Sequence, residues 1–241
     1  MSAPVIGAGN LAPAGTAQPA NFKRIYVWEV PVRVYHWVNA IVLVGLCVTG
    51  YLIGAPQRIF YANESYQLYW FGSVRFIHFL CAFVYVFVTL GRLYWAFAGN
   101  QYARWENFIP HTKQHFENIK DTLLVEMLQV KKHGKTYMGH NTMAASSYFG
   151  MFLAFIFQTV TGLALYGSNS DAKITHIFNW IVPIFGGDAG VRFWHHTFLW
   201  IFVLFVIVHV YLTIYDDVVE GRGEISAMIS GWKFKKNTSG H

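Results

Sequence analysis

The sequence predicts an all-α integral membrane protein, built as a bundle of four transmembrane helices. Of its 241 residues, 54% are hydrophobic and 12% are charged, whereas about 25% of the residues of a typical soluble domain are charged. Four apolar runs are long enough to cross a hydrocarbon core of about 30 Å. They cover residues 34–53, 76–98, 143–166 and 193–215. The gaps between them leave no room for a sizeable soluble domain.

The lysines and arginines outside these runs predict the topology. Three precede the first run, six lie between the second and third, and four follow the last run. The other two loops carry one each, Arg58 and Lys173, besides Arg75 and Arg192 directly before the second and fourth runs. Because loops rich in lysine and arginine stay in the cytoplasm, we expect a multi-pass protein of the inner membrane with both termini in the cytoplasm. Membrane topology therefore explains the net charge of +6, and the charge does not indicate nucleic-acid binding.

Residues 1–27 are predicted to form a flexible N-terminal tail, residues 28–236 the membrane domain and residues 237–241 a C-terminal tail. The N-terminal segment is rich in alanine, glycine and proline and lacks the basic start and apolar core of a signal peptide. In the loop between the second and third runs, apolar residues recur every three or four positions. They are Phe116, Ile119, Leu123, Met127 and Val130. This pattern predicts an amphipathic helix in the cytoplasmic interface, and a solvated helix would show the same pattern.

Two histidines in the last apolar run point to cofactor ligands. His195 and His209 are fourteen positions apart, so on a helix they lie within about 40° of the same face and about 21 Å apart along the axis. Ionisable side chains inside a membrane are costly and usually functional. Two imidazoles at this spacing fit two stacked haems. His196 lies about 140° away from His209 around the helix, so we rank it below His195.

Three of the runs begin with arginine followed three positions later by histidine. The pairs are Arg33 with His36, Arg75 with His78, and Arg192 with His195. Residues at this spacing share a helix face. The imidazole could then bind haem iron, while the arginine lies near the polar boundary, where it could contact a propionate. Cys47 and Cys81 form no CxxCH motif, which excludes covalent c-type attachment.

The depth of each histidine in its helix pairs the ligands. The first helix starts inside and the second and fourth start outside, so His36 and His209 lie near the cytoplasm, and His78 and His195 near the periplasm. We therefore expect two non-covalent b haems with bis-histidine ligation, one iron held by each pair. A single histidine near a helix end is usually an ordinary interfacial residue. The four matching depths favour the ligand interpretation.

Other features leave alternatives open. Glycines in the runs would let a flat ring approach the backbone, and close helix packing explains them equally well. They are Gly45, Gly50, Gly91, Gly150 and Gly162. A metal site at His111 and His115 is a weaker interpretation than a solvated pair. Proton-relaying histidines in a transporter or a passive anchor are a further alternative, which a haem-free purified protein would favour.

The segments RVYHW, RFIHF and HHTFLWIFVLFVIVH, followed by VYLTIYDDV, resemble the b-type cytochrome subunit of membrane-bound nickel–iron uptake hydrogenases. The resemblance covers residues 28–236, including ISGWK. It extends more loosely to formate dehydrogenase gamma subunits and other dihaem cytochromes b. The family's ligand positions fall on His36, His78, His195 and His209.

The resemblance implies a subunit that is not itself catalytic. It would anchor the small and large subunits of a periplasmic hydrogenase and pass electrons from H₂ oxidation to the quinone pool. A formate dehydrogenase-like partner is the alternative. Quinone would then bind near the cytoplasmic haem, in the vicinity of Tyr35, Tyr215 and Asp216. Ordinary interfacial polar residues explain these three side chains as well.

Overall fold

Four long helices dominate the computed structural model, which describes residues 22–55, 69–107, 142–171, 173–220 and 223–236. The helices are α1 (Val30–Gly54), α2 (Trp70–Ala98), α4 (Thr142–Ser168) and α6 (Asp188–Glu220). Each contains a stretch long and apolar enough to cross a membrane, which confirms the predicted four-helix architecture. Every helix includes the predicted run, and most extend beyond it at both ends, because backbone hydrogen bonding continues past the first polar residue.

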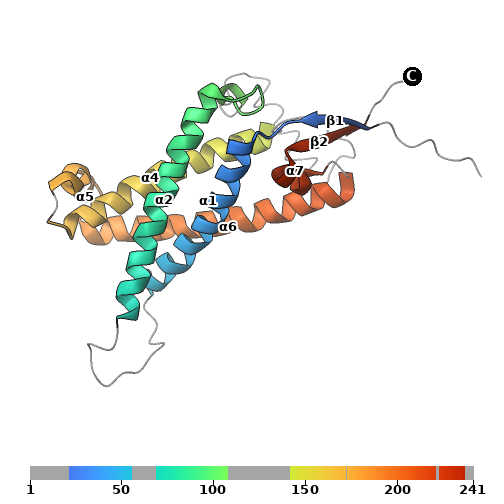
Figure 1. Ribbon diagram of the computed structural model, residues 1–241. Coiled ribbons are helices and arrows are strands. Elements are labelled where there is room, and N and C mark those ends of the chain that lie inside the picture. The colour runs from blue at the N-terminus through green and yellow to red at the C-terminus, as the bar shows by residue number, and fades with distance from the viewer. Residues whose placement is uncertain (1–21, 56–68, 108–141, 172, 221–222, 237–241) are drawn as a thin grey trace, which may run out of the picture.

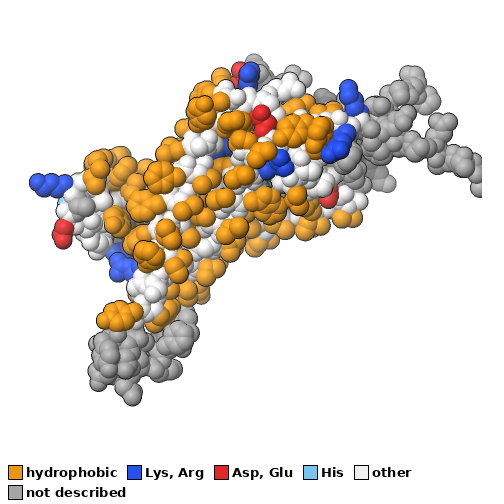
Figure 2. Space-filling model, in the orientation of Figure 1, with side chains coloured by type: hydrophobic (Ala, Val, Ile, Leu, Met, Phe, Trp, Pro, Cys, Tyr) orange, Lys and Arg blue, Asp and Glu red, His pale blue; other side chains and the backbone are white. Residues whose placement is uncertain are grey.

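The helices pack mainly in two pairs. Helix α1 lies against α2 and helix α4 against α6, and α1 also contacts α6, so the pairs join into one bundle (Figure 1). Large apolar side chains remain exposed along the helices, among them Ile41 (72%), Phe87 (70%) and Leu204 (63%). Figure 2 shows hydrophobic side chains over much of the visible face of the bundle. A surface of this kind is matched to lipid, which solvates apolar groups as well as a protein core does.

One end of the bundle carries a small ribbon. Strand β1 (Phe22–Tyr26) pairs antiparallel with β2 (Trp232–Lys236), with Tyr26 opposite Trp232. The short helix α7 (Glu224–Ser230) precedes β2. Residues 22–26 fall within the segment predicted as a flexible tail, but the structure places them in a strand. The first and last described segments therefore lie together at the same end of the bundle (Figure 1).

A compact core fixes this ribbon to the helices. It consists of Val27, Trp28, Val32, Ala103 and Ala227. Gly231 turns the chain from α7 into β2 with a positive φ of 87°, a conformation that glycine adopts without a steric penalty. Its carbonyl accepts hydrogen bonds from the amides of Val27 and Trp28, at 2.8 and 3.1 Å.

Polar contacts also hold the start of α1 in place. The Glu29 carboxylate accepts hydrogen bonds from Trp95 Nε1 at 2.9 Å and from the Asn100 amide at 2.8 Å, which ties α1 to the end of α2. Arg33 donates to the Ile229 carbonyl of α7, and Trp37 Nε1 donates to the neighbouring Met228 carbonyl at 3.0 Å. These contacts fix the turn of α1 that carries His36.

The other end of the bundle is covered by short elements. They are the 3₁₀ helix η4 (Lys173–Phe178) and the single turn α5 (Ile181–Ile184). A further 3₁₀ turn, η2 (Trp105–Asn107), follows α2 at the ribbon end. The amphipathic loop helix predicted around residues 116–130 lies outside the described residues, as do His111 and His115.

Candidate functional site

His36 of α1 and His209 of α6 face each other across the bundle. Their ring centroids are 6.2 Å apart, with an angle of 54° between the ring planes. Two imidazoles that bind one iron from opposite sides each form a metal–nitrogen bond of about 2.0 Å. Adding the distance from each nitrogen to its ring centre gives a separation of about 6 Å. The spacing of these two rings therefore fits a shared metal. We call this pair the His36–His209 layer.

Aromatic rings surround the His36–His209 layer. Phe205, one turn before His209 on α6, stacks on its imidazole at 5.5 Å with an interplanar angle of 12°. Trp37 meets the His36 ring edge-on at 5.2 Å. His36 Nδ1 is buried and has no hydrogen-bond partner among the described residues. Buried polar atoms are seldom left unpaired, so this nitrogen is available to a group bound in the layer.

A second pair of histidines is hydrogen-bonded to threonine hydroxyls through Nδ1. Thr49 Oγ1 of α1 lies 2.9 Å from His78 Nδ1 of α2, and Thr161 Oγ1 of α4 lies 2.9 Å from His195 Nδ1 of α6. We call this pair the His78–His195 layer. In both cases Nδ1 is engaged, which leaves the other ring nitrogen for a metal.

The residue after each threonine is a glycine that makes room for the same histidine. A Cβ atom on Gly50 would lie 3.4 Å from His78 Cε1, and one on Gly162 would lie 3.2 Å from His195 Cε1. The same Cβ atom on Gly50 would lie 3.1 Å from a methyl group of Leu199, which is one turn after His195. All four long helices therefore contribute to this layer.

The three predicted arginines occupy different environments. Arg33 is bound to the α7 carbonyl described above, whereas Arg75 and Arg192 are exposed at the starts of their helices. A fourth arginine, Arg92 of α2, is buried with 6% of its surface exposed. It donates to the Ala103 carbonyl at 3.1 Å. Sequence analysis did not select Arg92, because an arginine near the end of a span usually extends to the polar interface.

The residues predicted near a quinone lie towards the β-ribbon end. The Tyr35 ring lies beside Arg92, with 5.9 Å between its centroid and the guanidinium carbon. Tyr215 stacks on Tyr211 at 6.2 Å. Asp216 belongs to α6, but its side chain is outside the described part of the structure. No contact between the three links them into one site within the described residues.

His196 has a different environment from its neighbour His195. Its imidazole lies against Gly54 in the last turn of α1, where it occupies the space that a Cβ would need. The ring is thus packed on the backbone of another helix.

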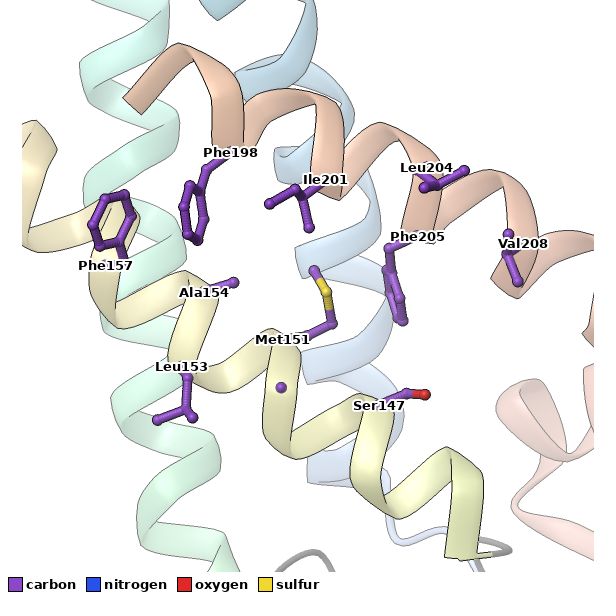
Figure 3. Close-up of a pocket in the computed structure, with 11 residues that line it drawn as sticks. Ser147, Met151, Leu153, Ala154, Phe157, Phe198, Ile201, Leu204, Phe205 and Val208 are labelled. Carbon is purple, nitrogen blue, oxygen red and sulfur yellow. The ribbon is translucent and has the colours of Figure 1, made fainter. Parts of the chain in front are cut away.

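An apolar cavity of about 610 Å³ lies between α4 and α6. Its lining includes Met151 and Ala154 of α4 and Ile201, Phe205 and Val208 of α6, and Figure 3 shows these side chains pointing into the gap between the two helices. Phe205 connects the cavity to the His36–His209 layer, because the same ring stacks on His209. The cavity therefore places an apolar volume beside one histidine pair. Across the described residues, no cluster of three or more potential metal-binding side chains occurs.

Sequence analysis missed the two threonines, although a signal was present. The tripeptide Val-Thr-Gly occurs at residues 48–50 and again at residues 160–162. Both copies of the tripeptide lie in the second half of their helix, and each contacts a histidine of a neighbouring helix. A search for the same tripeptide in two apolar runs would have found both positions.

Comparisons with known proteins identify relatives along nearly the whole chain. A family model described as prokaryotic cytochrome b561 matches residues 27–231. The probable Ni/Fe-hydrogenase B-type cytochrome subunit of Azotobacter vinelandii is 39% identical over 217 residues, which cover 88% of this chain and 90% of that protein. The corresponding protein of Cupriavidus necator is 35% identical over 92% of this chain and 91% of its own length. The probable Ni/Fe-hydrogenase 1 B-type cytochrome subunit of Escherichia coli K12 is 34% identical over 90% and 93%. The chain belongs to the prokaryotic cytochrome b561 family.

Proposed function

We propose that the chain carries two b haems, one in each histidine layer, and acts as an electron-transfer subunit in the membrane. His36 and His209 bind one iron, and His78 and His195 bind the other. The 6.2 Å separation of the His36 and His209 rings carries this proposal, because it is the spacing that two axial imidazoles need. The threonine contacts at His78 and His195 and the adjacent glycines support the second site.

The donor set fits a haem and suits electron transfer. Bound haem supplies a carrier that takes up and releases one electron at a time. Two imidazoles on each iron leave no open coordination position, which favours electron transfer over oxygen chemistry. The chain's own contribution is to hold neutral imidazoles at fixed depths in an apolar environment that excludes water. Arg75 and Arg192, exposed at the starts of α2 and α6, are placed to meet propionates at the polar boundary.

The names of the relatives favour a nickel–iron hydrogenase as the partner. In this proposal the α5 end of the bundle faces the periplasm and anchors the hydrogenase small and large subunits there. The ribbon end, with Lys23, Arg24 and Lys233, faces the cytoplasm, in accordance with the distribution of positive charge. Electrons from H₂ oxidation enter at the His78–His195 layer and leave from the His36–His209 layer. The chain itself catalyses no reaction.

A quinone accepts the electrons near the His36–His209 layer. Tyr35, Tyr215 and Asp216 lie on α1 and α6 towards that end. The cavity bordered by Phe205 supports the same location, since a quinone combines a small flat ring with an apolar tail. The polar ends of these side chains would orient the ring oxygens and supply protons.

The test is to purify the chain from membranes with its native partners and expose the complex to H₂. The proposal predicts co-purification of a nickel-containing partner, reduction of the b haems by H₂ as seen in the absorption spectrum, and H₂-dependent reduction of an added short-chain quinone. A complex with a molybdenum-containing partner that reduces the haems with formate would contradict the hydrogenase assignment. A pigment-free chain would contradict the haem assignment itself.

A further inference from the structure

We propose that Thr49 and Thr161 are positioning residues, which fix the tautomer and orientation of His78 and His195 through hydrogen bonds to Nδ1. The inference rests on the proposed haem sites. It identifies the side-chain atoms of neighbouring helices that hold the two histidines in place. Both threonines are buried, with 7% and 1% of their surfaces exposed, so water does not compete strongly for their hydroxyls.

The direction of the hydrogen bond at His78 follows from the donors available. A threonine hydroxyl has one proton to donate and two lone pairs that accept. Thr49 donates that proton to the Gly45 carbonyl of its own helix, at 2.6 Å. Its contact with His78 Nδ1 at 2.9 Å therefore has the imidazole as donor. His78 then carries its proton on Nδ1, and Nε2 keeps the lone pair that a metal requires.

The same arrangement recurs on a different pair of helices. Thr161 donates to the Phe157 carbonyl at 2.7 Å and lies 2.9 Å from His195 Nδ1. By the same count of donors, His195 also carries its proton on Nδ1. In both helices the residue four positions earlier takes the hydroxyl proton, and the following glycine leaves space for the ring. The repetition on two pairs of helices argues against a chance contact.

Each hydrogen bond has an expected electronic effect. An acceptor on the Nδ1–H group orients the imidazole and makes it a stronger electron donor to its metal. A stronger donor favours the oxidised state of the iron, so the threonines should hold the midpoint potential of this haem down. Valine has nearly the same shape as threonine but cannot accept a hydrogen bond.

The experiment measures haem content, midpoint potentials and low-spin electron paramagnetic resonance spectra of the purified complex carrying Thr49→Val or Thr161→Val. Each variant should raise the potential of the same haem, the one in the His78–His195 layer, and leave the other unchanged. Thr49→Ser and Thr161→Ser should restore the original potential, because serine keeps the hydroxyl. The control is Thr89→Val, since Thr89 is also buried in a span at 6% exposure and its hydroxyl has no hydrogen-bond partner among the described residues.

The outcomes separate the two proposals. Loss of that haem in the valine variants, with retention in the serine and Thr89→Val variants, also supports the positioning role. Unchanged potentials and spectra in both valine variants would overturn it while leaving the haem sites intact. Equal loss or shift in the serine and valine variants would overturn it too, because the hydroxyl would then not be the group that acts. Shifts of two different haems by the two valine variants would contradict the pairing of His78 with His195.

Discussion

The two histidine layers are held by different physical means. In the His78–His195 layer, each imidazole meets a hydroxyl and a glycine of a neighbouring helix. In the His36–His209 layer, aromatic rings surround the imidazoles, and His36 Nδ1 has no partner among the described residues. A hydrogen bond fixes one ring atom in direction and distance, whereas a stacked ring constrains the plane and permits sliding. The His78–His195 layer should therefore tolerate less change in its surroundings than the His36–His209 layer.

The two layers also differ in the elements that hold them in place. The His36 turn of α1 is tied to α7 through Arg33 and Trp37, so its backbone is fixed by a compact end. Side chains from all four long helices contribute directly to the His78–His195 layer. Contacts to the backbone of α7 thus hold the His36–His209 layer in place, whereas hydroxyl groups and close packing hold the His78–His195 layer.

Among substitutions that leave the four histidines in place, the largest effect is expected for Gly162→Ala. The new methyl group would lie 3.2 Å from His195 Cε1, so the imidazole or the helix must shift. Overpacking of this kind costs about 1–3 kcal/mol, which corresponds to about 5- to 150-fold weaker haem retention if the cost falls on the bound state. Haem content after detergent extraction, measured against total protein, tests this. Only the haem of the His78–His195 layer should be lost.

Gly150→Ala is the matched control, because it lies on the same helix and a methyl group there meets nothing within 4 Å. It should retain both haems. Equal losses from Gly150→Ala and Gly162→Ala would mean that glycine serves general helix packing in α4, and the contrast between the layers would fail.

A smaller effect is expected for Phe205→Ala in the other layer. The Phe205 ring stacks on His209, and such aromatic pairs contribute about 0.5–1.5 kcal/mol beyond burial. The variant should retain the haem of the His36–His209 layer a few-fold less well and broaden its low-spin spectrum. Phe198→Ala is the control, since that ring lines the same cavity but stacks on Phe157. An equal disturbance of the haem in both variants would show that loss of cavity volume, and not the stack on His209, is responsible.

The sequence was sufficient to predict the four helices. The apolar runs predicted four helices, because a membrane admits few alternatives. The depths of His36 and His209 in their helices predicted that the two lie in one layer, and their 6.2 Å separation is consistent with that pairing. The assignment of all four histidines as axial ligands stays a prediction.

The contacts between helices could not be predicted in the same way. The rotation of each helix about its own axis decides which glycine faces a histidine. The hydropathy of the sequence does not indicate this rotation. Gly50 and Gly162 face imidazoles, Gly45 faces Cys81, and Gly91 and Gly150 face open space, although all five were equivalent in the sequence. The β1–β2 ribbon was missed for a related reason, because its five-residue strands pair across almost the full length of the chain.

Arg92 shows the limit of residue type as a guide. An arginine near the end of an apolar run is expected to extend to the interface. The structure turns it inward, between the rings of Tyr35 and Tyr148. The sequence could not specify this, because the pocket is formed by α1, α2 and α4 together.

The most direct test of the account is haem content per chain in single and double histidine variants. Replacing any one of the four proposed ligands by alanine should leave one haem, and His196→Ala should leave two. The double variant His36→Ala/His209→Ala should still retain one haem, since both residues serve the same iron. The double variant His36→Ala/His78→Ala should retain none. One haem in the second double variant, or none in the first, would contradict the two-layer arrangement.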